Sequence, residues 1–287
     1  MTSTLPPLVD VLDLLPDAVC VVDEHARYLF VSASFERILG YRAADVLGRQ
    51  AFEFVHPEDR DDTEQQAARV TDGAIQRHFR NRYLHKDGHV VDMQWAARWH
   101  PEYRVRIGVG REITELRRVE RELEHLARHD PLTGLPNRHT LQQALEQALA
   151  DARAGGDGLA LLYVDLDGFK AANDEGGHDA GDRLLQDVAT RLTQALRHGD
   201  VAARVGGDEF VILLPGCRSP DAARRIADAL RAQLRPVYSL AGRPFQLDAS
   251  VGVACFPGDG QDAAALIAHA DRDMYAVKGR SRRADLR

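Results

Sequence analysis

Two short apolar runs separated by a four-residue interruption constrain the fold more than any other part of the sequence. The runs cover residues 201–205 and 210–214, and Gly206-Gly207-Asp208-Glu209 stands between them. Branched and aliphatic residues on both sides of two glycines predict a β-hairpin, because a tight turn needs positive φ at its centre. Two adjacent carboxylates at the end of an apolar hairpin repel each other, and a bound cation would offset that cost. Glycines also let a phosphate or a sugar approach the backbone.

A second pair of acids follows the apolar run at 159–164. Asp165 and Asp167 come at the end of this predicted strand. Because side chains two residues apart lie on the same face of a strand, both carboxylates are expected on one side of its end. Carboxylate oxygens are the ligands that hard divalent cations such as Mg²⁺ prefer. The sequence therefore predicts that acids from separate β-segments converge on a divalent cation.

These segments resemble the GGDEF family, the diguanylate cyclases that condense two GTP molecules into cyclic di-GMP and release pyrophosphate. The similarity covers roughly residues 125 to 287. It rests on Gly206-Gly207-Asp208-Glu209-Phe210, on Asp130-Pro-Leu-Thr-Gly-Leu-Pro-Asn-Arg138, and on Phe169-Lys170 and Asn173-Asp174 after the second acidic pair. It implies an α+β fold for residues 130–287, with the ferredoxin-like sheet of nucleotidyl cyclases and polymerase palms.

The resemblance also implies which residues bind metal and catalyse the reaction. Asp165, Asp208 and the main-chain carbonyl of Leu166 are expected to hold Mg²⁺, two ions per active site, with Mn²⁺ as an alternative metal. Lys170 would neutralise charge on the triphosphate, and Glu209 would accept the proton of the 3′-hydroxyl. The sequence leaves open how the roles are divided between Asp208 and Glu209.

Further residues match the substrate contacts of the family. Asn173 and Asp182 are expected to read guanine, since an amide and a carboxylate together complement its donor edge and its O6. His178 lies at another substrate position, and the start of a helix explains it equally well. The full set implied for GTP is Asn173, His178, Asp182, Gly206, Gly207, Lys278 and Arg282.

Two basic motifs complete the comparison with the family. Lys278 and Arg282 are expected to hold the β and γ phosphates. The family has Lys-x-x-Gly-Arg, whereas this chain has Lys278-Gly-Arg-Ser-Arg282, so Arg280 remains an alternative to Arg282. Arg197-His-Gly-Asp200 lies at the family's spacing for an inhibitory product site, where Arg197 and Asp200 would bind cyclic di-GMP. A solvated helix end is the alternative explanation of that motif.

The first part of the chain has a different pattern, with strand-like runs, small helices and then three longer strands, expected at 75–84, 90–100 and 103–109. This pattern predicts a second α+β domain over residues 8–112. The phrases at 35–41, 55–59 and 86–88 resemble those of a PAS sensory domain. The stripe of alternate residues Val91, Met93, Trp95, Ala97 and Trp99 is interpreted as packed core rather than as a cofactor wall, and the PAS ligand is left unknown.

A connector over residues 113–129 joins the two domains. Its apolar residues recur every three or four positions among charged ones, which predicts an amphipathic helix with Thr114 as its cap. These residues are Ile113, Leu116, Val119, Leu123 and Leu126. About two heptads do not define a coiled coil, and an ordinary surface helix is the alternative. A narrow apolar seam between two domains favours a parallel homodimer.

Composition narrows the choice of partners. A net charge of −7 leaves no broad basic surface for nucleic acid. No apolar run approaches the roughly 20 residues of a membrane span, and no signal peptide is recognisable, so no membrane partner is expected. Three scattered cysteines, without metal-site or disulfide spacing, suit the cytoplasm.

The sequence as a whole predicts a diguanylate cyclase that is regulated by its PAS domain and by its product. The alternative is a non-catalytic receptor for GTP or cyclic di-GMP. The acids, the lysine and the amide of the cyclase motifs are all present in this chain, which favours the enzyme over the receptor.

Overall fold

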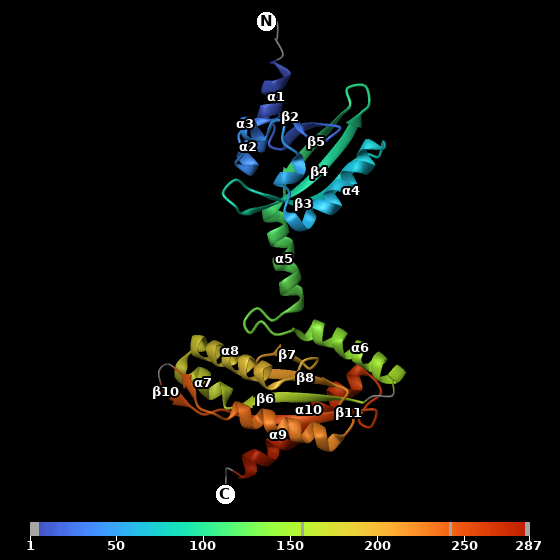
Figure 1. Cartoon of the computed structure of the whole chain (residues 1–287). Coiled ribbons are helices and arrows are strands. Elements are labelled where there is room, and N and C mark those ends of the chain that lie inside the picture. Colours follow the sequence, from blue (N-terminus) through green and yellow to red (C-terminus); the bar gives the residue numbers. More distant parts are fainter. Residues whose placement is uncertain (1–5, 156–157, 241–242, 285–287) are drawn as a thin grey trace, which may run out of the picture. The chain divides into compact units, whose positions relative to one another are not determined.

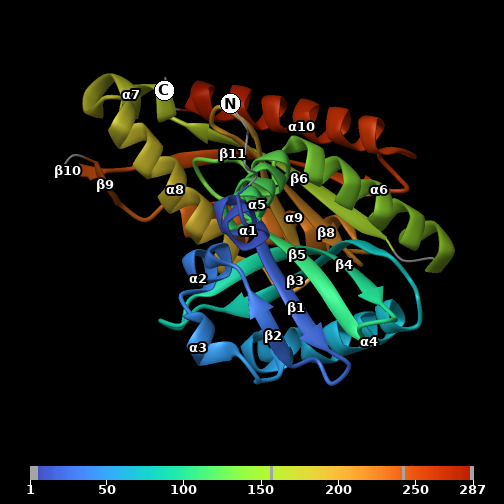
Figure 2. The same ribbon diagram turned by 90° about the horizontal axis from the view of Figure 1, so that it is seen from above.

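The chain forms two compact units, Met1–Glu122 and Leu123–Arg287. The structure is a computed structural model that describes residues 6–155, 158–240 and 243–284, and for residues 240, 243 and 280–284 it describes the main chain only. Figure 1 and the rotated view in Figure 2 show the elements of each unit. Both units combine helices with an antiparallel sheet, which confirms the predicted α+β fold class.

The first unit is built on a five-stranded antiparallel sheet in the order β2-β1-β5-β4-β3. Its core contains buried residues of the sheet together with residues of α2, α3 and the first 3₁₀ helix. Gly40 ends α2 in a left-handed conformation, as predicted. The elements are α1 (Leu8–Leu14), β1 (Ala18–Asp23), β2 (Tyr28–Val31), α2 (Ala33–Leu39), α3 (Ala43–Val46), η1 (Ala51–Phe54), η2 (Pro57–Asp59), α4 (Arg60–Thr71), β3 (Gln76–Leu84), β4 (Val90–His100) and β5 (Val105–Glu112).

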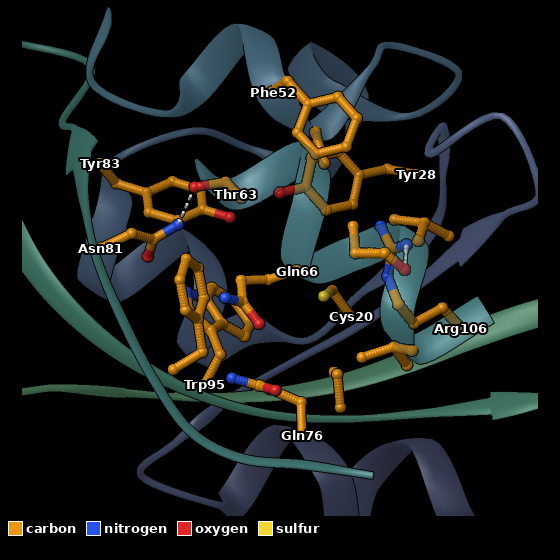
Figure 3. Close-up of a pocket in the computed structure, with 17 residues that line it drawn as sticks. Cys20, Tyr28, Phe52, Thr63, Gln66, Gln76, Asn81, Tyr83, Trp95 and Arg106 are labelled. Carbon is orange, nitrogen blue, oxygen red and sulfur yellow. Dashed lines mark hydrogen bonds between the residues drawn. The ribbon is translucent and has the colours of Figure 1, made fainter. Parts of the chain in front are cut away.

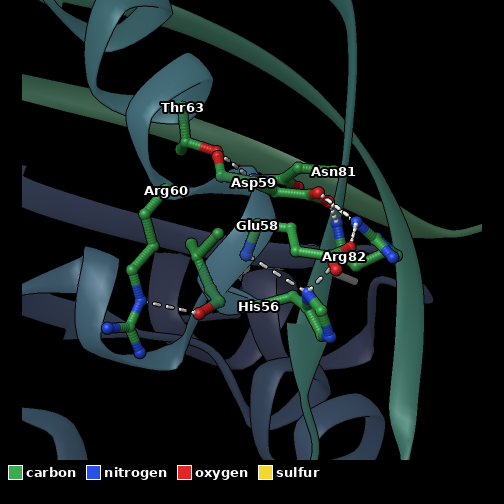
Figure 4. A network of polar contacts seen from close by, with 8 residues as sticks. His56, Glu58, Asp59, Arg60, Thr63, Asn81 and Arg82 are labelled. Carbon is green, nitrogen blue, oxygen red and sulfur yellow. Dashed lines mark hydrogen bonds and ion pairs between the residues drawn. The ribbon is translucent and has the colours of Figure 1, made fainter.

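A salt-bridged corner fixes the start of α4 against β3 (Figure 4). The Asp59 carboxylate accepts hydrogen bonds from the Arg82 main-chain N–H at 2.7 Å and from its guanidinium at 2.5 and 3.0 Å. This pairing holds the pKa of Asp59 below its usual value. The Thr63 hydroxyl donates to the Asp59 carbonyl and accepts from the Asn81 amide. The short 3₁₀ turn η2, which directly precedes α4, therefore presents Asp59 to the sheet.

The connector helix, α5 (Thr114–Arg128), contains no buried residue. Four residues of its predicted seam are exposed, with Leu116 and Leu123 50% and 60% accessible, whereas Ile113, just before the helix, is buried. The hydroxyl of Thr114 accepts a hydrogen bond from the main-chain N–H of Asp92 at 3.1 Å, so this residue fastens α5 to β4. An ion pair of 3.1 Å between Arg121 and Asp92 supports the same attachment.

The second unit has a four-stranded antiparallel sheet in the order β11-β6-β8-β7. Counted along the chain, this is the fourth, first, third and second strand of the sheet, which is the ferredoxin-like order that was predicted. The elements are α6 (Arg138–Gly155), β6 (Leu159–Asp167), α7 (Phe169–Gly176), α8 (His178–Ala195), β7 (Val201–Gly206), β8 (Glu209–Pro215), α9 (Pro220–Leu234), β9 (Tyr238–Leu240), β10 (Arg243–Phe245), β11 (Asp248–Phe256) and α10 (Ala263–Ala284).

Helices cover both faces of this sheet. Residues of α8 and α9 share one buried cluster with alternate residues of β6, such as Leu162 and Val164. Residues of α6 and α10 share a second cluster with Leu161 and Tyr163, which point to the opposite face. Since every residue from 159 to 166 is buried, β6 is the central strand on which both layers rest, and it carries the acidic pair at its end.

A small β9-β10 hairpin precedes β11 (Asp248–Phe256), and α10 continues to residue 284. The turn between β7 and β8 differs from the prediction, which placed both glycines in it. The hairpin turn is formed by Gly207 and Asp208, while Gly206 pairs with Glu209 inside the ladder.

The packing of α10 on β11 predicts opposite effects for two glycines. A Cβ at Gly252 would lie 2.0 Å from the Ala270 carbonyl oxygen and 2.2 Å from the Met274 nitrogen of α10, whereas a Cβ at Gly279 would meet nothing within 4 Å. We expect Gly252→Ala to lower the free energy of unfolding by about 2–3 kcal/mol. Gly279→Ala should raise it by about 0.5–1 kcal/mol. Urea unfolding followed by circular dichroism measures both, and equal shifts of one sign would contradict the packing.

Candidate active site at the β7-β8 turn

The glycines at the hairpin turn are not explained by packing. A Cβ built on Gly206 or Gly207 would meet no atom within 4 Å. Gly207 has φ = +43°, so the turn itself favours glycine there, but Gly206 has no such requirement. Both residues are exposed. The space above this backbone is therefore open to a ligand.

The ladder of β6 and β8 brings the predicted acids together. Asp165 pairs with Glu209 across the two strands, so that both side chains emerge on the same face. The Leu166 N–H donates to the main-chain carbonyl of Asp208 at 3.3 Å. Partial burial raises the pKa of the Asp208 carboxyl, and the nearby negative charge of Asp165 adds to this effect. Three carboxylates from two β-segments thus meet at one end of the sheet.

A cation already contacts this acidic cluster. The Lys278 ammonium of α10 lies 2.5 Å from Oδ1 of Asp165, whose side chain is only 12% exposed. This is one positive charge beside the carboxylates of Asp165, Asp208 and Glu209. Oxygen donors that converge in a half-buried, negatively charged position fit a divalent cation. Asp165, Asp208 and the Leu166 main chain are the residues in place to hold one.

Asp167 does not join this cluster as the sequence led us to expect. Its Oδ2 accepts a hydrogen bond from the Ser250 hydroxyl of β11 at 2.8 Å. Asp167 pairs across the ladder with Asp248, which two arginines of the α9 end hold, Arg231 at 2.8 Å and Arg235 at 3.0 Å. The two acids at the end of β6 therefore have different partners, because Ser250, which lies opposite Asp165 in the ladder, donates its hydroxyl to Asp167.

Sequence reasoning missed the partner of Glu209. The Tyr163 hydroxyl, two residues before Asp165 on β6, donates to Oε2 of Glu209 at 3.1 Å. Burial and the Glu209 charge raise the pKa of Tyr163 to about 12, so the phenol stays protonated and keeps donating. The period of two along β6 places Tyr163 and Asp165 on one face, and this was the available signal.

Sequence reasoning also missed the clamp that supports the turn. The Arg204 guanidinium donates to the Gly207 carbonyl at 2.8 and 3.0 Å and to Oδ1 of Asp130 at 2.9 Å. Asp130 also accepts from the Thr133 N–H and hydroxyl. The segment at 130–138 thus braces the hairpin as well as starting α6, for which the Asn137 side chain caps the first turn.

The predicted GTP-binding residues on α7 and α8 are largely exposed. Lys170, His178 and Asp182 are accessible, and Asn173 is half-buried. A Cβ at Gly181 would lie 2.0 Å from Oδ1 of Asn173, so this glycine leaves the space that the amide occupies. Because Gly181 directly precedes Asp182, the two side chains proposed to read guanine emerge beside each other at the α7-α8 junction.

The remaining predicted residues have the following positions. Arg197 donates to Oδ1 of Asp200 at 3.1 Å and to the Pro215 carbonyl at 2.8 Å. The Asp200 side chain is 5% exposed and the Arg197 side chain is 63% exposed. Arg282 and its alternative Arg280 belong to α10, but the structure describes only their main chain.

Comparisons with known proteins agree with this geometry. Residues 127–284 match the family described as "Diguanylate cyclase, GGDEF domain", and residues 8–113 match the PAS fold. Among curated proteins, the chain is 44% identical over 169 residues to the bifunctional diguanylate cyclase/cyclic di-GMP phosphodiesterase MucR of Pseudomonas aeruginosa, covering 59% of this chain and 24% of that one. It is 41% identical over 161 residues to the diguanylate cyclase TpbB of the same species, covering 56% and 37%.

Solved structures give the same result. A sensory box/GGDEF family protein from Caulobacter crescentus is 42% identical with a TM-score of 0.51, and the match covers 53% of this chain and 98% of that one. The GGDEF domain of TpbB is 40% identical with a TM-score of 0.52, covering 53% and 89%. A coiled-coil and GGDEF structure of DgcB from Caulobacter crescentus, in complex with c-di-GMP, is 27% identical with a TM-score of 0.52, covering 58% and 88%.

The fold and the acidic turn define an α+β domain of the nucleotidyl-cyclase type that follows a PAS domain. The family match covers more than half of the chain, and the chain belongs to the GGDEF family. It spans less than two-fifths of the length of the curated relatives MucR and TpbB.

The pair between Lys278 and Asp165 leads to a prediction about cations. Lys278→Met removes the ammonium and leaves a largely buried carboxylate uncompensated, so we expect the free energy of unfolding to fall by about 2 kcal/mol without divalent metal. Millimolar Mg²⁺ should recover more of the stability of this variant than it adds to the wild type. Lys170→Met, which removes an exposed cation, should change stability by less than about 0.5 kcal/mol. A Lys278→Met protein indifferent to Mg²⁺ would argue against a cation site.

Proposed function

We propose that this protein is a diguanylate cyclase that converts two GTP molecules into cyclic di-GMP and pyrophosphate. The convergence of Asp165, Asp208 and Glu209 from two β-segments, beside an open glycine turn, is the observation that carries the proposal. Family membership supports the same reaction, because relatives with about 40% identity are described as diguanylate cyclases.

The residues of the site suggest how the reaction is assisted. Asp165, Asp208 and the Leu166 carbonyl would hold Mg²⁺, with two ions per site in our proposal and Mn²⁺ as the alternative metal. When bound, the metal would lower the charge barrier to attack on an α-phosphate. Glu209, oriented by the Tyr163 hydroxyl, is placed to accept the proton of an attacking 3′-hydroxyl.

Substrate binding is assigned to the elements around the turn. Gly206 and Gly207 would let the phosphates approach the main chain, since nothing occupies the space above them. Lys170 at the start of α7 and Lys278 on α10 would neutralise the triphosphate, and Lys278 would exchange its bond to Asp165 for one to phosphate. Asn173 and Asp182, with His178 nearby, would recognise guanine. We retain Arg282, or Arg280, as a further phosphate ligand.

The product has twofold symmetry, so we propose that two half-sites meet in a homodimer. The exposed seam of α5 is the surface on which the two protomers would associate, because none of the apolar residues within the helix is buried. The PAS domain would then regulate the cyclase by changing how the two connector helices pair.

Arg197 and Asp200 are proposed as an inhibitory site for cyclic di-GMP. The guanidinium is exposed and keeps donors free of its bond to the buried Asp200 carboxylate, so it can fork onto a phosphate or a guanine edge. No helix among the described residues is long and apolar enough to cross a membrane. We place the reaction in the cytoplasm because GTP is available there and the three cysteines are free thiols.

The activity can be tested directly with GTP and Mg²⁺. We expect the purified protein to form cyclic di-GMP and pyrophosphate, both measured by chromatography, and to leave ATP unreacted. Asp208→Ala should lower the rate at least about 100-fold. Glu146→Ala, which removes an exposed acid of α6, serves as the matched control and should leave the rate unchanged. Tight GTP binding without turnover would instead identify a receptor.

The dimer can be tested through the connector. Replacing Leu116 and Leu123 with glutamate should lower cyclase turnover roughly tenfold or more at micromolar protein, because half-sites then meet rarely. GTP binding per protomer should survive. Exchanging the exposed Glu115–Arg118 pair, as Glu115→Arg with Arg118→Glu, provides a control on the same helix. Light scattering gives the oligomeric state, and unchanged turnover in a monomeric leucine variant would rule out this dimer.

A further inference from the structure

The PAS unit encloses a cavity next to its sheet (Figure 3). Its volume is about 80 Å³, and strands β1, β4 and β5 form one wall while η1 and α4 contribute the other side. Cys20 and Trp95 are among the residues that line it. Burial raises the pKa of the Cys20 thiol to about 12, as expected for an apolar surrounding.

Two glycines on β5 leave room beside this cavity. Gly108 lines it, and Gly110, two positions further along the same face of β5, lies against Trp95. A Cβ at Gly108 would lie 3.1 Å from the Cys20 sulfur, and a Cβ at Gly110 would lie 2.6 Å from the Trp95 ring. The indole therefore lies flat over β5. The third residue of this alternation is Arg106, which also lines the cavity.

Arg106 is a charged side chain at a position that otherwise belongs to the core. Within the part of the chain that the structure describes, no carboxylate pairs with its guanidinium, which donates a 3.4 Å hydrogen bond to the Ala67 carbonyl. Burial lowers its pKa, while the groups that act on it electrostatically are Cys20, Tyr28 and Tyr83, all neutral at pH 7. Arg106 is partly buried, and its guanidinium lacks the counter-ion that a charge withdrawn from water requires.

Other polar groups of the lining are also incompletely bonded. The indole Nε1 of Trp95 and the amide Oδ1 of Asn81 are buried without a hydrogen-bond partner. The Tyr28 hydroxyl is close to that of Tyr83 but makes no hydrogen bond of normal geometry. The three residues are at least nine-tenths buried. Because native proteins rarely leave such donors unsatisfied, the indole N–H and the Tyr28 hydroxyl indicate a bound molecule that supplies oxygen acceptors.

We propose that this cavity binds a short-chain aliphatic monocarboxylate, with Arg106 as its counter-ion. The carboxylate would accept the guanidinium donors, and a tail of one to three carbons would lie against Cys20 and Trp95. The volume sets the length: about 80 Å³ is roughly half of a cavity that accommodates benzene. A single negative charge is expected because one guanidinium is available.

Propionate is the probe for this site, with propionamide as its neutral isostere. Full-length protein without nucleotide or divalent metal is titrated while tryptophan fluorescence and Tm are followed, since Trp95 lines the cavity. We expect saturable propionate binding with a Kd on the order of 1 mM or tighter, and a raised Tm. Propionamide, octanoate and inorganic phosphate should bind at least about tenfold more weakly, because each lacks the charge, the size or the tail that fits.

Arg106→Met tests the counter-ion separately from folding. Removing an unpaired buried charge should leave the Tm of the free protein unchanged or higher, while the propionate response should weaken at least about tenfold. Arg98→Met, an exposed residue of β4 on the opposite face, is the matched control. Arg106→Lys keeps the charge and should retain weakened binding.

Several results would overturn the proposal. Equal binding of propionamide and propionate would show that Arg106 does not act as a counter-ion. Stronger binding of phosphate than of propionate would show that the site does not select a ligand with an apolar tail. A large loss of Tm in Arg106→Met without ligand would show that the guanidinium is structural. Because none of these measurements uses GTP, their outcome is independent of the cyclase assay.

Discussion

The strand pairing that brings carboxylates together at the end of β6 and in the β7-β8 turn is the constraint on which the site of the second unit depends. The ladder fixes Asp165 opposite Glu209, and the Leu166 N–H holds the main chain of Asp208 beside them, so the acids cannot separate without breaking the sheet. Neighbouring side chains stabilise these carboxylates. Lys278 forms an ion pair with Asp165, and the Tyr163 hydroxyl donates a hydrogen bond to Glu209. A purely structural design would avoid such crowding. A site that holds a cation and phosphates requires it.

Local patterns were sufficient to predict the hairpin, the order of elements and the acids at the turn. Period-two alternation and the pair of glycines act over a few residues, and they are enough to locate the hairpin of β7 and β8. They do not fix which residues of a run of glycines and acids form the turn, and in the structure Gly206 belongs to β7 rather than to the turn.

Side-chain partners distant in sequence could not be predicted. Tyr163 and Glu209 are 46 positions apart, and Asp130 and Arg204 are 74 apart, so their contacts follow from strand register and loop path. The cavity shows the same limit. Trp95 was interpreted as core from its own strand, and it is buried, but it is also a cavity wall because Gly110 lies across from it on β5. The sequence signal for the cavity was the presence of Arg106, Gly108 and Gly110 on one face of β5. It could not be interpreted from β5 alone, because the residues that these positions face lie on other strands.

The polar lining of the PAS cavity is continuous with the strands that hold α5. Asn81 lines the cavity and bonds Thr63, whose hydroxyl donates to Asp59, the partner of Arg82 (Figure 4). One position before Asn81 on β3, Arg80 lies 3.5 Å from Glu120 of α5, and on β4 the neighbouring Asp92 bonds both Thr114 and Arg121. A ligand that changes how Asn81 is bonded therefore acts on the two strands to which the first turns of the connector are attached. A packed sheet responds to such a change by shifting between discrete arrangements rather than by gradual deformation. We therefore expect occupancy of the cavity to act on the seam of α5.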